Sequence, residues 1–201
     1  MKRFSQSTIS ALTLTLFVAY AHANDEEDME SMVEDEKGWQ FLAGKHEDFV
    51  FEPTLSLMLG LADSEDVEGG AVFSWGLEAS FNCPLLQPST NKIRQQVSYF
   101  EYSDADSTIQ SFEINPHYVV DVMDDLWIGA GPGFGYVRAE VDGNTANMAA
   151  LQLGASIHYN IDKIFIGGEA RYQFTTEDDI GDKKNSGADN WRTALKVGFN
   201  F

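Results

Sequence analysis

The strongest structural signal in the chain is the segment Phe51-Glu52-Pro53-Thr54-Leu55-Ser56-Leu57-Met58-Leu59-Gly60-Leu61. Large apolar side chains occupy the odd-numbered positions, with Pro53 as the exception. The even-numbered positions are polar or small, with Met58 as the exception. Side chains of a β-strand point alternately to its two faces, so this period of two separates an apolar face from a polar face. The segment therefore predicts an amphipathic strand.

The same alternation recurs along the rest of the chain. The third segment is the least regular, because Phe100 and Tyr102 share the face that carries its polar residues. Short turns are predicted at 121–125 and 160–163, and mostly longer polar loops elsewhere. With the first segment the strands number eight, the even count typical of up-and-down barrels. The further segments cover residues 71–82, 93–102, 111–120, 126–136, 149–159, 164–174 and 191–201.

The length of these segments favours a barrel in a membrane over a water-soluble sandwich. Each spans about 9 to 12 residues, which suits a tilted strand that crosses a bilayer, whereas sandwich strands are usually about five or six residues long. No run of about 20 apolar residues follows residue 23, so the sequence offers no transmembrane helix. The sequence predicts an all-β fold, an eight-stranded antiparallel transmembrane up-and-down β-barrel. In the alternative sandwich, the aromatic residues of the apolar face would form the core.

Charged residues on the polar face predict a network inside this barrel. A charge that faced the lipid would be costly, whereas one that turns inward can pair with a charge of opposite sign. The predicted interior charge network comprises Glu52, Glu78, Arg94, Glu113, His117, Glu169, Arg171, Arg192 and Lys196.

The N-terminus has the features of an export signal. Lys2 and Arg3 precede an apolar stretch, and Ala21-His22-Ala23 predicts cleavage before Asn24, so residues 1–23 form the signal peptide. The net charge of −19 becomes −21 once the signal leaves, which argues against a nucleic-acid partner. Residues 24–50 are predicted to be an acidic, flexible periplasmic segment, in which Trp39, Phe41, Leu42 and Phe49 could pack at the barrel entrance. The barrel domain is predicted to cover residues 51–201.

The signal peptide, the eight amphipathic strands and the ending Leu195, Val197, Phe199, Phe201 resemble the small outer-membrane barrels of the OmpA, OmpX and OmpW kind. The resemblance covers residues 51–201 and implies a location in the outer membrane of a Gram-negative bacterium. It also implies that Phe199 and Phe201 form the signal read by the barrel-assembly machinery. Outer-membrane lipids and lipopolysaccharide are the other expected partners, and the chain is expected to be monomeric.

Eight strands enclose an interior just wide enough for side chains to fill, so a wide pore is not expected. The sequence therefore predicts a structural or surface-interaction role, with no cofactor, no metal site and no enzymatic activity. Acidic external loops would present Asp63, Glu65, Asp66, Glu68, Asp104, Asp106, Glu177, Asp178, Asp179 and Asp182.

Two other functions remain open from the sequence. A narrow channel for small or apolar solutes, as in OmpW-type barrels, would use the space beside Gly129, Gly131, Gly133 and Gly135. A lipid-modifying enzyme would need a nucleophile and a base, for which Ser156 and His158 are candidates. The enzyme is the less favoured alternative, because both residues fall on the inner face and no third partner is evident.

Overall fold

The computed structural model describes residues 38–64, 70–104, 107–141, 143–180 and 183–201, with only the backbone described at 179–180 and 183–186. The predicted signal peptide and the acidic block at 24–37 lie outside the described residues. In the described part, no helix combines the length and the hydropathy that crossing a membrane requires.

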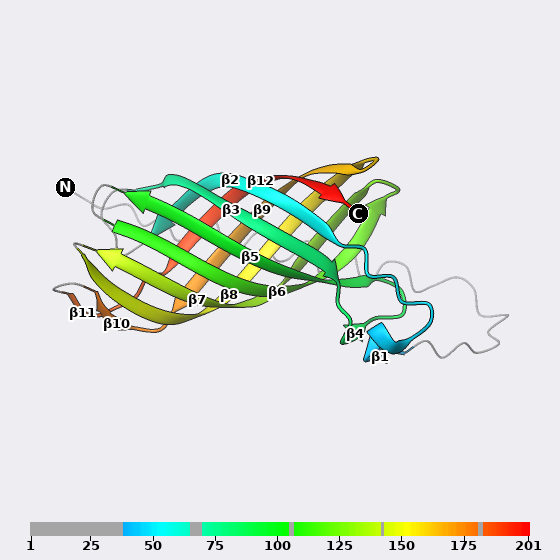
Figure 1. The fold of residues 1–201 in the computed structure, drawn as a ribbon, viewed down its shortest axis with the longest axis horizontal. Helices are drawn as coiled ribbons and strands as arrows, with labels where there is room; N and C mark the ends of the chain where they lie inside the picture. Colours follow the sequence, from blue (N-terminus) through cyan, green and yellow to red (C-terminus); the bar gives the residue numbers. More distant parts are fainter. Residues whose placement is uncertain (1–37, 65–69, 105–106, 142, 181–182) are drawn as a thin grey trace, which may run out of the picture. The chain divides into compact units, whose positions relative to one another are not determined.

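Eight strands form a closed antiparallel barrel in the described residues, in the order β12-β2-β3-β5-β6-β7-β8-β9 (Figure 1). This confirms the predicted fold class, since consecutive strands are neighbours and the last strand closes on the first. The strands are β2 (Thr54–Ser64), β3 (Val72–Asn82), β5 (Lys92–Asp104), β6 (Ser107–Met123), β7 (Leu126–Val141), β8 (Asn144–Ile161), β9 (Ile164–Thr175) and β12 (Asn190–Asn200).

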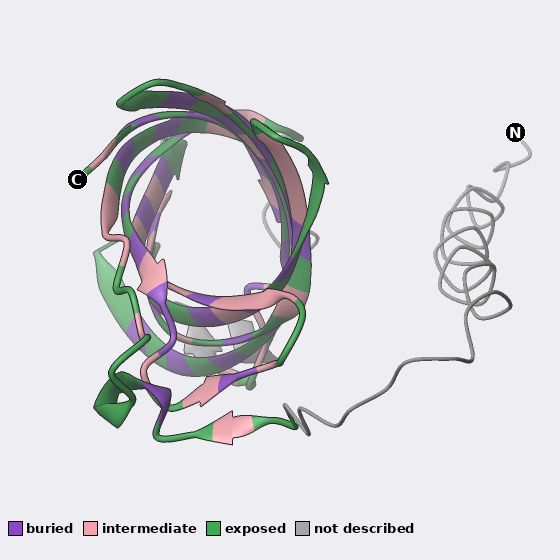
Figure 2. Ribbon diagram, turned by 90° about the vertical axis from the view of Figure 1, so that its right-hand side faces the viewer, coloured by how far each residue is buried: buried purple, intermediate pink, exposed green. Residues whose placement is uncertain are grey.

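Burial alternates residue by residue along these strands, as Figure 2 shows. On β2, Leu55, Leu57, Leu59 and Leu61 are exposed on the outside, whereas Met58 is fully buried in the lumen. The irregular third segment follows the same rule on β5, where Phe100 and Tyr102 are buried among the inward-facing residues. The faces read from the sequence are therefore those of the structure.

Four strands are longer than the predicted 9 to 12 residues. β5 has 13 residues, β6 has 17, β7 has 16 and β8 has 18. The predicted ends were placed where large apolar side chains stop, but backbone pairing continues past that point to the hairpin at Gly143, whose φ of 78° suits a tight turn. Beyond the apolar band the outer face is polar, with Arg138, Glu140 and Asn147 exposed.

The pairing of β6 with β7 is interrupted near the middle of the wall. The register pairs Ile114 with Phe134 and Tyr118 with Ala130, which places Pro116 opposite Pro132 between them. Neither proline has an N–H group to donate, so this position of the ladder has no backbone hydrogen bond. Gly131 fits here because a Cβ on it would lie 1.9 Å from the carbonyl oxygen of Pro116.

The last long loop, at 175–190, contains backbone pairing of its own. It contains the hairpin of β10 (Asp178–Ile180) and β11 (Lys183–Ser186) and then turns inward, so that Ala188 is buried. The N–H of Ala188 donates to Thr175 Oγ1 at 2.7 Å, and Asp189 Oδ1 accepts from the N–H and the hydroxyl of Thr175. These bonds hold the loop against the barrel mouth.

A small second sheet lies at the opposite end of the barrel, the end at which β12 finishes (Figure 1). β1 (Gln40–Phe41) pairs with β4 (Leu86–Gln87), and the 3-10 helix η1 (Ala43–Lys45) follows β1. Trp39 and Phe41, which are expected from the sequence to pack at the barrel entrance, are exposed instead.

Candidate functional site in the barrel lumen

The lumen is filled by two layers of side chains and opens into a cavity at one end. An apolar layer lies towards the end that carries the long loops. The interior charge network lies next to it, towards the end that carries the short turns. The apolar layer consists of Met58, Ala62, Phe100, Tyr102, Ile109, Val137, Ala139, Met148, Ala150, Ala188 and Ala194.

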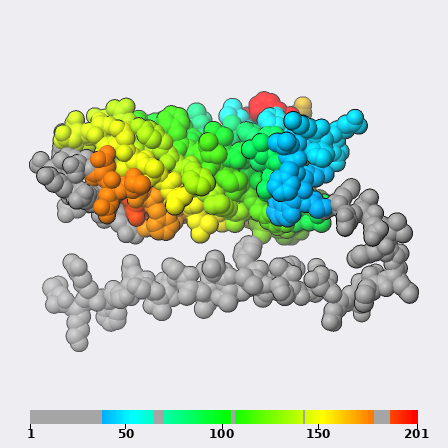
Figure 3. Space-filling model, turned by 90° about the horizontal axis from the view of Figure 1, so that it is seen from below, coloured from blue at the N-terminus to red at the C-terminus, as the bar shows by residue number. Residues whose placement is uncertain are grey.

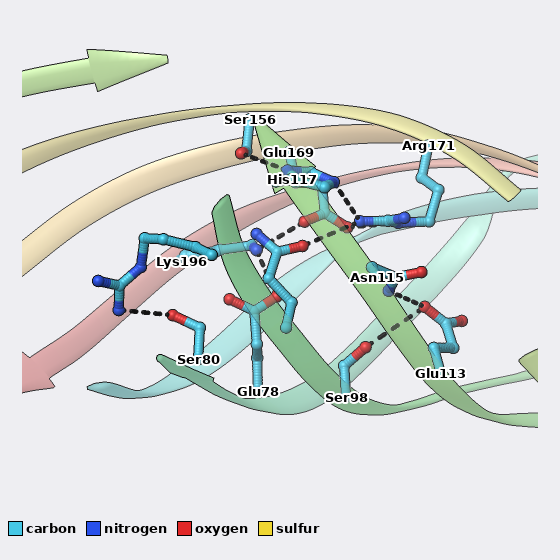
Figure 4. A network of polar contacts seen from close by, with 12 residues as sticks. Glu78, Ser80, Ser98, Glu113, Asn115, His117, Ser156, Glu169, Arg171 and Lys196 are labelled. Atoms are coloured by element: carbon cyan, nitrogen blue, oxygen red, sulfur yellow. Dashed lines mark hydrogen bonds and ion pairs between the residues drawn. The ribbon is translucent and has the colours of Figure 1, made fainter. Parts of the chain in front are cut away.

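Lys196 is the central cation of the network. Its Nζ lies 2.6 Å from Glu78 Oε2 on β3 and 2.6 Å from Glu169 Oε2 on β9, and all three side chains are almost fully buried. The other oxygen of Glu169 accepts a hydrogen bond from Arg171 Nε at 2.9 Å. In Figure 4 these side chains project from different parts of the wall toward one another. The four residues therefore form one continuous chain of opposite charges across the lumen.

His117 is joined to these four charged residues through Arg171. Arg171 Nη2 lies 3.2 Å from His117 Nε2, and His117 Nδ1 lies 3.1 Å from Ser156 Oγ. A guanidinium can only donate, so Nε2 must accept, and the proton of the neutral imidazole is then on Nδ1. His117 consequently donates to the Ser156 hydroxyl, and its ring is an uncharged link in the network.

Glu113 and Arg192 form a further buried ion pair. The two nitrogens of the Arg192 guanidinium face the two carboxylate oxygens of Glu113, which is the bidentate geometry that favours arginine over lysine. Glu113 also accepts hydrogen bonds from the hydroxyls of Ser98 and Ser111, at 3.3 and 2.6 Å. On the opposite side the guanidinium of Arg192 lies 4.3 Å from the ring centre of Phe100, where the network meets the apolar layer.

Arg94 and Glu52 complete the predicted set at the end that carries the short turns. Arg94 is buried and donates to the carbonyl oxygen of Glu52 and to Ser80 Oγ. Glu52 itself precedes β2 rather than facing the lumen from within it. Its carboxylate lies 3.0 Å from Lys92 Nζ and 3.6 Å from Arg94 Nη1. The structure therefore places Glu52 at the rim, apart from the central chain of charges.

The charge of Glu52 is maintained by its two cationic neighbours. Burial alone would raise the pKa of this carboxyl, but the hydrogen bond and the charge of Lys92, together with Arg94, outweigh burial and hold the pKa below its ordinary value of 4.5. The contribution of the contact to stability is therefore complete above pH 4.5 and is lost as the pH falls through the lowered pKa.

We expect Glu52→Gln to lower the denaturant midpoint of unfolding slightly at neutral pH, because Glu52 is partly exposed and its ion pairs are screened. The measurement is the unfolding midpoint of both proteins in detergent micelles over a series of pH values. The difference between them should disappear in acid, where the wild-type carboxyl is protonated. A difference independent of pH would show that the charge of Glu52 has no part in the effect.

A cavity of about 600 Å³ opens at the same end. Lys92, Arg94, Asp121, Asp124 and Trp127 are among the residues that line it. None of Glu78, Glu169, Arg171 and Lys196 is among its lining residues.

The glycines of β7 leave less room than the narrow-channel alternative requires. A Cβ on Gly133 would lie 1.7 Å from Asn115 Oδ1, and one on Gly135 would lie 2.9 Å from Gln152 Nε2. The glycines thus accommodate inward side chains from neighbouring strands, and the space beside them is occupied.

Ser156 and His158 do not form a catalytic pair. Ser156 bonds to His117, while the His158 ring is stacked between Trp127 and Phe165, with ring centres 3.7 and 4.8 Å away. His117 donates to the Ser156 hydroxyl and so cannot take its proton. The other described hydrogen-bond partner of the His117 ring is Arg171 and not a carboxylate. In the described part of the chain, no three His, Cys, Asp or Glu side chains converge as metal ligands would.

Phe199 and Phe201 lie apart from the lumen. Both are exposed on the outside at the end of β12, and the N–H of Phe201 donates to the carbonyl oxygen of Pro53. The apolar layer was missed by the sequence analysis, because Val137 and Met148 lie beyond the predicted strand ends. The signals for it were Met58 in the first segment and Phe100 and Tyr102 in the third, which are apolar residues on polar faces.

The chain is similar to several solved structures. Neisserial surface protein A has 16% sequence identity and a TM-score of 0.52, with 75% of this chain and 97% of that chain covered. Ail of Yersinia pestis has 10% identity over 75% of this chain and 97% of its own, with a TM-score of 0.49. The N-terminal β-barrel domain of Pseudomonas aeruginosa OprF has 15% identity over 76% and 100%, with a TM-score of 0.45.

No protein-family profile and no curated protein sequence matches the chain. At the identities above, a structural likeness concerns the fold alone. The likeness to Neisserial surface protein A, together with the closed sheet, shows that this chain has the fold of the small eight-stranded outer-membrane β-barrels.

Proposed function

We propose that this chain is an integral outer-membrane β-barrel protein with a structural or surface-interaction role and a lumen closed by its own side chains. The observation that carries the proposal is the filled interior. Phe100 and Ile109 in the apolar layer are at most 2% exposed, as are Glu113 and Lys196 in the network. A lumen occupied in this way supports an anchor or a surface scaffold and argues against a pore.

The outer wall supports a membrane location. Its large apolar side chains, such as Leu57, Ile114, Phe134, Leu153 and Leu195, are between 45% and 70% exposed. Water-soluble proteins rarely expose so continuous an apolar surface, whereas a barrel in lipid requires one. We place the short turns and the terminus in the periplasm and the long loops outside, with outer-membrane lipids and lipopolysaccharide around the wall. Phe199 and Phe201 would serve the barrel-assembly machinery.

The first test is whether the protein behaves as a folded outer-membrane barrel. Electrophoresis of the outer-membrane fraction with and without boiling should show a heat-dependent change in mobility. A protein found in the soluble fraction, with the same mobility in both samples, would overturn the membrane location.

The second test is conductance in planar bilayers. We expect wild-type protein to show no single-channel steps, and the double variant Glu113→Ala with Arg192→Ala to show small ones, because it removes both partners of a pair that crosses the lumen. Alanine at Arg138 and Glu140, an exposed pair 3.9 Å apart, is the matched control and should stay silent. Steps from wild-type protein would instead support the narrow channel.

A further inference from the structure

A group of large apolar side chains is exposed beyond the barrel strands, at the end where the short turns lie. Trp39, Phe41 and Leu42 belong to β1 and the residues beside it, and Leu85 directly precedes β4. They are 55%, 73%, 50% and 64% exposed, respectively. These four residues, here named the apolar foot, are not part of the barrel wall and contribute nothing to the lumen.

The exposure of the apolar foot is not the result of a loose chain. The N–H of Leu42 donates to the carbonyl oxygen of Leu85 at 2.7 Å, and the N–H of Gly44 donates to that of Pro84 at 2.8 Å. Leu42 adopts a left-handed backbone with φ of 53°, which L residues rarely do. Backbone pairing thus fixes the two segments to each other with their apolar side chains outward.

A second set of bonds fixes this sheet to the barrel. Gln87 Nε2 donates to the carbonyl oxygens of Cys83 and Ile93, and Gln87 Oε1 accepts from the N–H of Ile93. The buried amide of Gln87 therefore joins β4 to the start of β5, so the position of the apolar foot relative to the wall is determined by hydrogen bonds.

The apolar surface of the wall continues past the barrel strands to Phe51. Phe81 faces outward near the end of β3, and Phe51 stacks on it with ring centres 4.7 Å apart while remaining 46% exposed. Viewed from this end, β1 and β4 lie outside the ring of barrel strands and not over its opening (Figure 2). The space-filling view shows the segment around residues 38–54, in blue, on the flank of the barrel at this end (Figure 3).

We propose that the apolar foot inserts into the phospholipid leaflet at the turn end of the barrel, at the boundary between headgroups and acyl chains. This rests on the proposed membrane location. An apolar group that hydrogen bonds hold on the flank of a lipid-facing wall, outside the ring of strands (Figure 2), fits the same lipid phase. Trp39 is a residue type favoured at that boundary, and Lys45 in η1 can reach headgroup phosphates. The foot would thereby fix how deep and at what tilt the barrel sits.

The test is the fluorescence of Trp39 in vesicles of brominated phosphatidylcholine. Phe replaces Trp75, Trp127 and Trp191, so that Trp39 is the only tryptophan. We expect its emission to fall to about half with bromines near the headgroup, and to fall less with bromines near the chain ends, as for a residue at the interface. Emission unaffected by bromines but fully quenched by aqueous acrylamide would overturn the proposal.

Two controls separate the possible occupants. Quenching that depends on the protein-to-lipid ratio would indicate a second copy of the chain, and protection from both quenchers would indicate cover by protein; either result overturns the lipid proposal. If the triple variant fails to fold, a nitroxide label on Leu85→Cys, with Cys83 changed to Ser, reports the same depth by its accessibility to oxygen and to a nickel chelate. The heat-dependent mobility of the same samples tests the membrane barrel independently, so failure of the foot leaves that result intact.

Discussion

Lys196→Met is expected to cause the largest loss of stability among single changes in the network. Lys196 contacts the carboxylates of Glu78 and Glu169, each at 2.6 Å, and the three side chains are almost fully buried. Removing the cation leaves Glu78 without an ion-pair partner among the described contacts. Breaking a buried pair on one side typically costs about 3–5 kcal/mol, because the remaining charge is buried and uncompensated.

The measurement is the free energy of unfolding in urea, followed by tryptophan fluorescence of the barrel in detergent micelles or vesicles. Lys163→Met is the matched control, since Lys163 is exposed in the turn between β8 and β9. Adding Glu78→Gln to Lys196→Met should recover part of the loss, because the buried carboxylate is then replaced by a neutral amide. Equal effects of Lys196→Met and Lys163→Met would show that the network does not stabilise the barrel.

Gly60→Ala is expected to have the second largest effect, because Gly60 lies on β2 at the pair that closes the barrel with β12. A Cβ at this position would lie 1.9 Å from the carbonyl oxygen of Thr193 and 2.7 Å from the Cα of Ala194. These are backbone atoms held in the ladder between β2 and β12, so relief requires the strands to separate. Overpacking of this kind costs about 1–3 kcal/mol or more.

The control for Gly60→Ala is Gly168→Ala on β9. There an added Cβ would meet its nearest neighbours at 3.6 and 3.8 Å, which are ordinary contacts. We expect Gly168→Ala to leave the unfolding free energy close to that of the wild type, and Gly60→Ala also to reduce the fraction of protein that refolds into vesicles. If the two substitutions behaved alike, the close approach at the closing strands would not limit stability.

Lys196→Met tests a feature that the sequence predicts, whereas Gly60→Ala tests one that it does not. Strand periodicity alone places Lys196 and Glu78 on the inner face. The requirement for glycine at position 60 was not visible in the sequence, because it arises from the approach of Thr193, which is far away along the chain. The alternation of residues along a strand predicts the face to which a side chain points. It does not predict how closely the neighbouring strand approaches.

The ends of the strands are also only partly predicted by the side-chain pattern. Large outward side chains stop near Tyr136 on β7 and begin again near Ala149 on β8, so the sequence pattern predicts strand ends at these positions. Backbone hydrogen bonds need no apolar side chains, so the hairpin continues to Val141 and Asn144. The residues in this extension, including Val137 and Met148, then supply inward side chains to the apolar layer. The sequence could not reveal this part of the layer, because its residues lie outside the predicted strands.

The sequence by itself determined that the chain alternates through eight amphipathic strands and which side chains face inward, because the orientation of a strand side chain is a local property of the backbone. Only the tertiary structure decided which charges meet. Glu113 and Arg192 are 79 residues apart, and Glu78 and Lys196 are 118 residues apart. Their contacts depend on strand register and on closure of the sheet, which set the height of each side chain in the lumen, and no local pattern encodes that height.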